Sequence, residues 1–104
     1  MNTAKDVLDL EERISLEMRH ALVFVAALTA QDISGLQAST DAFHGIYVID
    51  VYISGVYRDS ILACPERGYG FYPLRELSDD DKPEVWETDV VSALRFFKER
   101  HNIS

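Results

Sequence analysis

The sequence predicts an α+β domain in which a long N-terminal helix and a C-terminal helix cover one face of an antiparallel meander of three or four strands. Three patterns predict this class. Apolar residues recur at steps of three and four over residues 7–28 and again over residues 90–97, which is the helical period. β-branched and aromatic residues alternate between two faces over residues 46–53, as they do in a strand. A chain of 104 residues is long enough for a single domain with its own core.

The first helix is expected over about residues 3–30. Charged residues separate its apolar positions as far as Arg19, and from Leu22 to Leu28 every residue is apolar. A helix that is apolar all round is buried, so this second half should form the spine of the core. The apolar steps are also close to a heptad, so a helix of this length could pair with a copy of itself. Packing on its own sheet is the simpler interpretation.

Three strands should follow, over residues 45–54, 56–64 and 69–75. Ser54 and Gly55 give a hairpin signal between the first two. Pro73 cannot donate to a ladder, so the third strand should lie at an edge or end there. Residues 31–44 are polar, which predicts a loop with at most a one-turn helix near Ser39.

The last helix is expected over about residues 89–101. Thr88 is the predicted N-cap, and Asp89 would lie in the first turn, where a carboxylate favours the helix dipole. Seven side chains from both helices and the first strand should lie in the core. They are Leu22, Val25, Leu28, Ile49, Val51, Leu94 and Phe97.

The net charge of -8 argues against a nucleic-acid-binding protein, which would cluster lysine and arginine. Residues 76–89 hold seven acids against Lys82. Such a field would attract a basic protein partner, although acidity can also serve solubility alone. One cysteine excludes an internal disulfide and fits a reducing compartment. With no signal-peptide pattern and no apolar run of the length that a bilayer needs, we expect a cytoplasmic protein without membrane contact.

No catalytic or metal-binding signature is present in the sequence. His20, His44 and His101 lack metal-ligand spacing, and Cys64 ends a strand beside Pro65 with no oxyanion-loop pattern. The three aspartates at 79–81 lack the order of an EF-hand, and the glycines at 68 and 70 precede a strand and not a helix. We therefore expect no enzyme, no cofactor and no metal.

All five tyrosines fall on the predicted sheet, where exposed aromatic side chains would suit a protein interface. The alternative is that tyrosine serves β-propensity alone. The candidate partner-binding residues combine the tyrosine face with the acidic stretch. They are Asp50, Tyr52, Tyr57, Asp59, Glu76, Asp79, Asp80, Asp81, Glu84 and Glu87.

The segment from Trp86 to Asp89, followed by Ser92, Leu94, Phe96 and Phe97, resembles the C-terminal end of some bacterial immunity proteins of contact-dependent growth-inhibition or related polymorphic toxin systems. The resemblance implies a small non-enzymatic protein that binds one cognate toxin, usually a nuclease with a basic active site. Two other classes fit the same surface. One is a phage-encoded inhibitor, such as an anti-CRISPR protein, that masks a basic nucleic-acid-binding surface. The other is a homodimeric accessory protein joined through the first helix.

Overall fold

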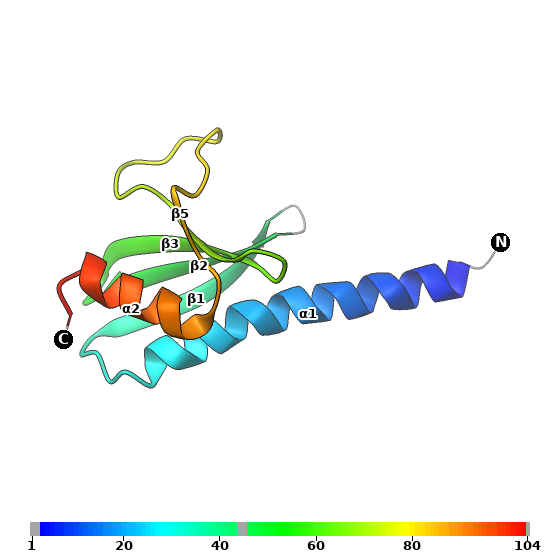
Figure 1. Cartoon of the computed structure of the whole chain (residues 1–104), viewed down its shortest axis with the longest axis horizontal. Coiled ribbons are helices and arrows are strands. Elements are labelled where there is room, and N and C mark those ends of the chain that lie inside the picture. The colour runs from blue at the N-terminus through cyan, green and yellow to red at the C-terminus, as the bar shows by residue number, and fades with distance from the viewer. Residues whose placement is uncertain (1–2, 44–45, 104) are drawn as a thin grey trace.

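A five-stranded antiparallel sheet and two helices make up the computed structural model, which describes residues 3–43 and 46–103 (Figure 1). The strands follow one another in the sheet in chain order, as a meander. The elements in sequence are α1 (Thr3–Thr29), β1 (Leu36–Phe43), β2 (Ile46–Ile53), β3 (Val56–Cys64), β4 (Gly68–Phe71), β5 (Val85–Glu87) and α2 (Val90–Arg100). The predicted α+β class is confirmed, while the predicted count of three or four strands is wrong.

The two strands beyond the predicted meander lie at its edges. β1 occupies the segment predicted to be a loop, and its pairing with β2 runs without interruption from Leu36–Ile53 to Phe43–Ile46. β5 pairs with β4 through three residues, with Trp86 opposite Gly70. β4 is also shorter than predicted, because it ends at Phe71, two residues before Pro73.

Both helices pack on the same face of the sheet. The ring of Phe71 in β4 contacts Phe24 of α1 at a centroid distance of 6.3 Å and Phe96 of α2 at 4.7 Å. The buried apolar side chains form one cluster that draws on both helices and three strands. They are Ala21, Phe24, Leu28, Tyr47, Ile49, Val51, Ile61, Ala63, Tyr69, Phe71, Ala93 and Phe97.

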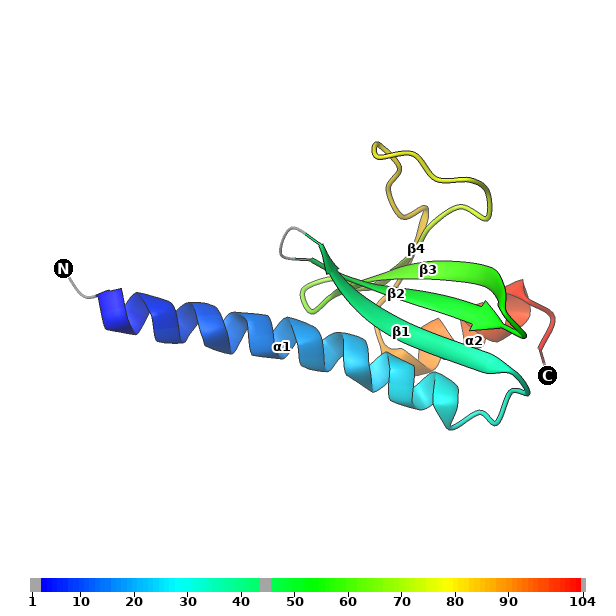
Figure 2. The same ribbon diagram turned by 180° about the vertical axis from the view of Figure 1, so that it is seen from behind.

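The core prediction is wrong for Leu22, whose side chain is 49 % exposed. Leu28 and Phe97 are fully buried as predicted, and Val25 packs at the margin of the core. α1 therefore is not the all-round buried spine that its composition predicts, since Met18 and Val23 are exposed as well. Figures 1 and 2 show why: the sheet covers one side of α1, and the N-terminal half of the helix runs past the end of the sheet.

Backbone conformation confirms one predicted turn and corrects one cap. Ser54 and Gly55 both have positive φ angles, of 53° and 79°, which is the conformation of a two-residue hairpin of the primed type. The N-cap of α2 is Asp89 and not Thr88, because the Asp89 carboxylate accepts a 2.8 Å hydrogen bond from the amide of Ser92. This contact also lowers the pKa of Asp89.

Candidate protein-binding face

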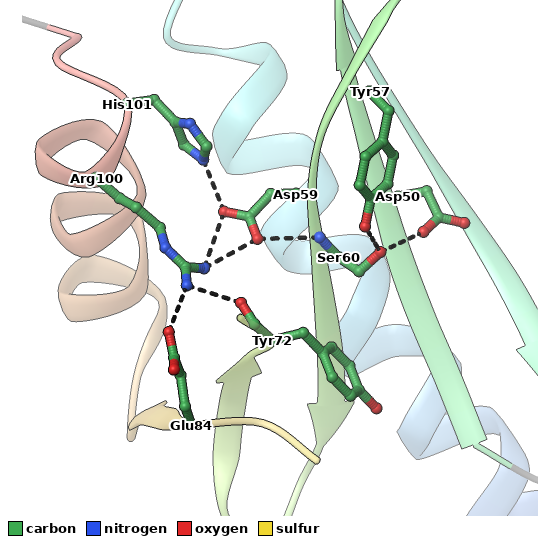
Figure 3. Close-up of polar contacts among 8 residues, drawn as sticks. All are labelled: Asp50, Tyr57, Asp59, Ser60, Tyr72, Glu84, Arg100 and His101. Atoms are coloured by element: carbon green, nitrogen blue, oxygen red, sulfur yellow. Dashed lines mark hydrogen bonds and ion pairs between the residues drawn. The ribbon is translucent and has the colours of Figure 1, made fainter. Parts of the chain in front are cut away.

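Asp59 and Ser60, which are consecutive in β3, face opposite sides of the sheet, and each belongs to a different polar network (Figure 3). Asp59 points toward α2, and Ser60 points toward the face that carries no helix, which we call the open face. The backbone amide of Ser60 donates to Asp59 Oδ1 at 3.0 Å. One strand thus fixes both a buried ion pair and a cluster of surface hydroxyl and carboxyl groups.

The network on the helix side is centred on Asp59, which is 1 % exposed. Arg100 Nη1 donates to Asp59 Oδ1 at 3.1 Å, and His101 Nε2 lies 2.7 Å from Asp59 Oδ2. Asp59 is one of the predicted partner-binding residues, but these contacts bury it against α2, so it is not available on the surface. A buried carboxylate needs this compensation, since leaving it unpaired costs several kcal/mol.

Arg100 also clamps the base of the loop formed by residues 73–83. Its Nη2 atom donates to the carbonyl oxygen of Tyr72 at 2.7 Å and to Glu84 Oε1 at 3.0 Å. Arg100 therefore binds the residue that precedes the loop and the residue that follows it. The amide of Glu84 donates to the carbonyl of Phe71 at 2.9 Å, which closes the base a second time. The loop therefore leaves the sheet from a fixed stem, on the side opposite to α1 (Figures 1 and 2).

Inside the loop, Asp81 is held by Arg75 and Ser78. The guanidinium of Arg75 makes two hydrogen bonds to the two oxygens of Asp81, at 2.6 and 2.9 Å, and the amide of Ser78 donates to Asp81 Oδ2 at 2.7 Å. The Arg75 contact lowers the pKa of Asp81 to about 2, with the Ser78 amide contributing. Asp81 thus stabilises the loop and is a poor candidate for free contact with a partner.

The acidic stretch is less uniform in space than in sequence. Asp81 and Glu84 pair with arginines, and Asp89 caps α2. Glu87 lies half-buried in β5, opposite Tyr69. The acids that remain exposed on the loop are Glu76, Asp79 and Asp80. The structure therefore concentrates the surface charge on the loop itself and not on the whole of residues 76–89.

The open face carries a chain of hydrogen bonds that ends at Asp50. Ser60 Oγ donates to Asp50 Oδ1 at 2.8 Å, which uses its one proton, so the hydroxyl of Tyr57 must donate to Ser60 Oγ. Burial raises the pKa of Asp50, and the neighbouring carboxylate of Asp41 raises it further. Burial also raises the pKa of Tyr57.

Tyr52 and Tyr57 form an exposed aromatic pair on this face. They lie opposite each other on β2 and β3, with ring centroids 5.6 Å apart and planes at 73°. Both side chains are exposed, as predicted from their place in the sheet. An edge-to-face pair is a favoured aromatic geometry, so the two rings present a defined shape to a partner.

A groove separates the loop from the strands of the open face. It is lined by Ile46, Val48, Ser60, Tyr72, Leu77, Ser78, Asp79 and Asp81. Ile46, Val48, Tyr72 and Leu77 make about half of this lining apolar, and Asp79 and Asp81 add carboxylates from the loop. This arrangement suits a side chain with an apolar stem and a cationic head, such as lysine or arginine.

The remaining candidates for chemistry serve packing or lie elsewhere. His20 stacks on Tyr69 at 4.2 Å and contacts the carbonyl of Gly68 at 2.9 Å. Cys64 is half-buried, and His44 lies outside the described residues. In the part of the chain that the structure describes, no three histidine, cysteine or acidic side chains group as metal ligands would.

Sequence reasoning misses Arg100 and Ser60, which organise the two networks. In the sequence, Arg100 is one of the bases in the last turn of a helix, where any cation suits the helix dipole, and no pattern marks Ser60. The contacts that define them join residues as far apart as 41 positions, so their spacing along the chain carries no signal.

Comparison with known proteins adds no relative from which a role could be transferred. The chain matches no family model, no curated protein and no solved structure. Function is therefore inferred from the geometry and charge of the face described above.

None of the helices in the described part of the chain is long and apolar enough to cross a membrane.

Proposed function

We propose that this chain is a small binding protein that neutralises a cognate basic protein through the open face and the loop of residues 73–83. Its most specific form is an immunity protein that blocks a nuclease toxin. The observation that supports this best is the exposed pair of Tyr52 and Tyr57 beside a rigidly anchored acidic loop. Tyrosine is enriched where protein partners bind, and acids draw a basic partner toward it.

Electrostatics favour a cationic side chain on the open face. The carboxylates of Asp41 and Asp50 lie close enough for one to raise the pKa of the other. A lysine or arginine from a partner would relieve this repulsion, in the way that an opposite charge favours the ionised form of a carboxylate. Asp79 lies in the wall of the adjoining groove and would extend the same field.

The two parts of this surface would contribute differently. The exposed loop acids would raise the association rate, and salt would screen that effect. Tyr52 and Tyr57 would supply affinity that depends little on salt, because aromatic burial is not screened. The acids would occupy positions that phosphates take on the partner, so the partner would lose access to nucleic acid.

A phage-encoded inhibitor, such as an anti-CRISPR protein, would use the same surface against a different basic target. The neighbouring genes distinguish the two: a toxin gene beside this one favours immunity, and a phage operon favours the inhibitor. The expected absence of catalysis belongs to both proposals.

The test captures partners from the native host with the wild-type chain and with variants in parallel, followed by mass spectrometry. One variant neutralises the exposed loop acids by Glu76→Gln, Asp79→Asn and Asp80→Asn, and leaves Asp81 in place because it holds Arg75. A second variant carries Tyr52→Ala. We expect a basic protein that the wild type retains and that both variants lose or retain weakly.

With the purified partner, the loop variant should associate more slowly at low salt and lose most of its salt dependence. Glu99→Gln, an exposed acid on α2, is the matched control and should bind as the wild type does. Capture of the same proteins by all variants, or a partner without a basic surface, would contradict the proposal.

A further inference from the structure

β1 is an open edge of the sheet, because no strand of the described chain pairs with it on the side away from β2 (Figure 2). The carbonyl of Gly35 accepts a 2.8 Å hydrogen bond from the amide of Ser54 and therefore faces β2. Backbone groups alternate in direction along an antiparallel strand, so those of residues 36, 38, 40 and 42 point away from the sheet. The amide of Leu36 bonds to Ile33, and the other outward groups have no partner within residues 3–43 and 46–103.

This edge lacks the features that usually keep an edge strand from pairing with another chain. Protected edge strands are short or bulged, or they carry lysine or proline. β1 has eight residues without lysine or proline, and its register with β2 is uninterrupted. β5, which forms the opposite edge, is only three residues long. β1 is therefore the edge at which the sheet is open to a further strand.

The side chains of β1 make the strand complementary to a copy of itself. Gln37, Ser39 and Asp41 are exposed on the open face, and Asp41 is the one charged residue of the strand. When two such strands run antiparallel with Ser39 opposite Ser39, Asp41 of each strand lies opposite Gln37 of the other. The amide donates to the carboxylate, so both acids gain a partner and no two acids face each other.

We propose that a second copy of this chain pairs antiparallel with β1 along this edge, about a twofold axis at Ser39. The outward backbone groups of Ala38 then bond to those of Thr40 in the other copy, and the amide of Ala42 bonds to the carbonyl of Leu36. One sheet continues through both copies, with both open faces on the same side. A twofold contact of this kind closes as a dimer and leaves no β1 edge for further growth.

The dimer does not rest on the proposed function. β1 and β5 lie at opposite edges of the sheet, and the loop of residues 73–83 connects β4 to β5. Loss of the dimer would therefore leave this loop and the pair of Tyr52 and Tyr57 in place. Because the seam is one strand wide, we expect a dimer that dissociates on dilution.

The test measures mass by analytical ultracentrifugation over a range of concentrations, with circular dichroism as the check on folding. The wild type should form a dimer. Ala42→Pro removes an outward N–H and keeps the bonds between β1 and β2, so it should weaken the dimer at least about fivefold while the fold persists. A wild type that stays monomeric at high concentration, or a dimer that Ala42→Pro leaves intact, overturns the proposal.

Charge at position 37 tests the register through two opposite changes. Gln37→Lys places an ammonium group opposite Asp41 of the other copy and should tighten the dimer about fivefold, and Gln37→Glu should weaken it by a similar factor. Val91→Lys and Val91→Glu, at an exposed site on α2, are the matched controls for net charge and should have little effect. Equal effects at positions 37 and 91 would contradict the pairing.

A disulfide locates the twofold axis. In a Cys64→Ser background, Ser39→Cys places two thiols opposite each other in a non-hydrogen-bonded pair, where a Cα separation of about 4.5 Å allows a disulfide. Mild oxidation should trap this variant as a covalent dimer. Gln37→Cys, on the same face of the same strand, is the matched control, because its two thiols would lie about 13 Å apart along the seam. A covalent dimer of Gln37→Cys, or none from Ser39→Cys, overturns the proposal.

Discussion

Replacing Asp59 with asparagine tests whether the buried network holds the fold together. The amide would keep the shape of the side chain and one oxygen acceptor but would remove the negative charge. The side chain of Arg100 is 9 % exposed, so its guanidinium would then face Glu84 as its remaining carboxylate partner. Removing one partner of a buried ion pair costs about 3–5 kcal/mol. A domain of this size has a total stability of about 5–15 kcal/mol, so the loss should be large.

The assay is urea unfolding followed by circular dichroism and by the fluorescence of Trp86, which lies half-buried with Arg67 over its ring at 4.0 Å. With a slope of about 1–3 kcal/mol per molar urea, the midpoint of Asp59→Asn should fall by roughly 2 M. Glu84→Gln is the control within the same network, because that carboxylate is 51 % exposed. An exposed ion pair contributes about 0–1 kcal/mol, so the control should unfold close to the wild type.

Hydrogen exchange at the loop base provides a second measurement. Arg100 holds both the carbonyl of Tyr72 and the carboxylate of Glu84, so loosening it should expose the bond from the Glu84 amide to Phe71. That amide should exchange faster in Asp59→Asn than the change in global stability requires. If Asp59→Asn costs less than about 1 kcal/mol, or Glu84→Gln costs as much as Asp59→Asn, the buried pair is not what fixes α2 and the loop.

Three further predictions concern packing, backbone space and pH. Phe97→Ala should cost about 3–5 kcal/mol in chemical unfolding because Phe97 is fully buried, whereas Val91→Ala on the same helix, at a side chain 67 % exposed, should stay within about 0.5 kcal/mol. Gly70→Ala should destabilise the sheet edge, because a Cβ there would lie 2.7 Å from Pro83; wild-type stability in that variant would show that the loop base shifts freely. Asp50→Asn should raise the melting temperature at pH 7. The pKa of Asp50 is raised in the folded protein, so folding is favoured while this carboxyl is protonated, below its ordinary pKa of about 3.9, and that stabilisation is lost as the pH rises through the pKa of the folded state. The difference between the two proteins should therefore close below about pH 4, and a constant difference would contradict it.

The strongly periodic elements could be predicted from the sequence, and the weakly periodic ones could not. β2 alternates β-branched and aromatic residues over its whole length, so its pattern is that of a strand. β1 has residues such as Ala38, Ser39 and Asp41, which have little preference for strands, and it forms because every one of its positions pairs with β2. β5 has three residues and exists through its pairing with β4. In both cases the tertiary context overrides local propensity.

The buried side of α1 could not be assigned because the helix is apolar on two sides. Leu22 and Phe24 are equally apolar in the sequence, and the sheet selects Phe24 for the core. The same limit applies to Asp59, whose partners lie 41 and 42 positions away in and just after α2. The spacing of apolar residues indicates whether a segment forms a helix or a strand. It does not indicate which distant charged residue will pair with a side chain such as Asp59.

The acidic stretch shows how a charge count in the sequence differs from a charge surface in space. Of its seven acids, those that structure the loop are neutralised: Asp81 by Arg75, and Glu84 by Arg100. Those that remain exposed are carried on a loop that is braced inside by Asp81 and at its stem by Arg100. A partner would therefore not have to order this loop on binding, and the entropy that ordering costs would be saved. The alternative is that the exposed loop acids only keep the protein soluble and do not contact a partner. In that case the variant with Glu76→Gln, Asp79→Asn and Asp80→Asn would bind its partner at low salt as fast as the wild type does.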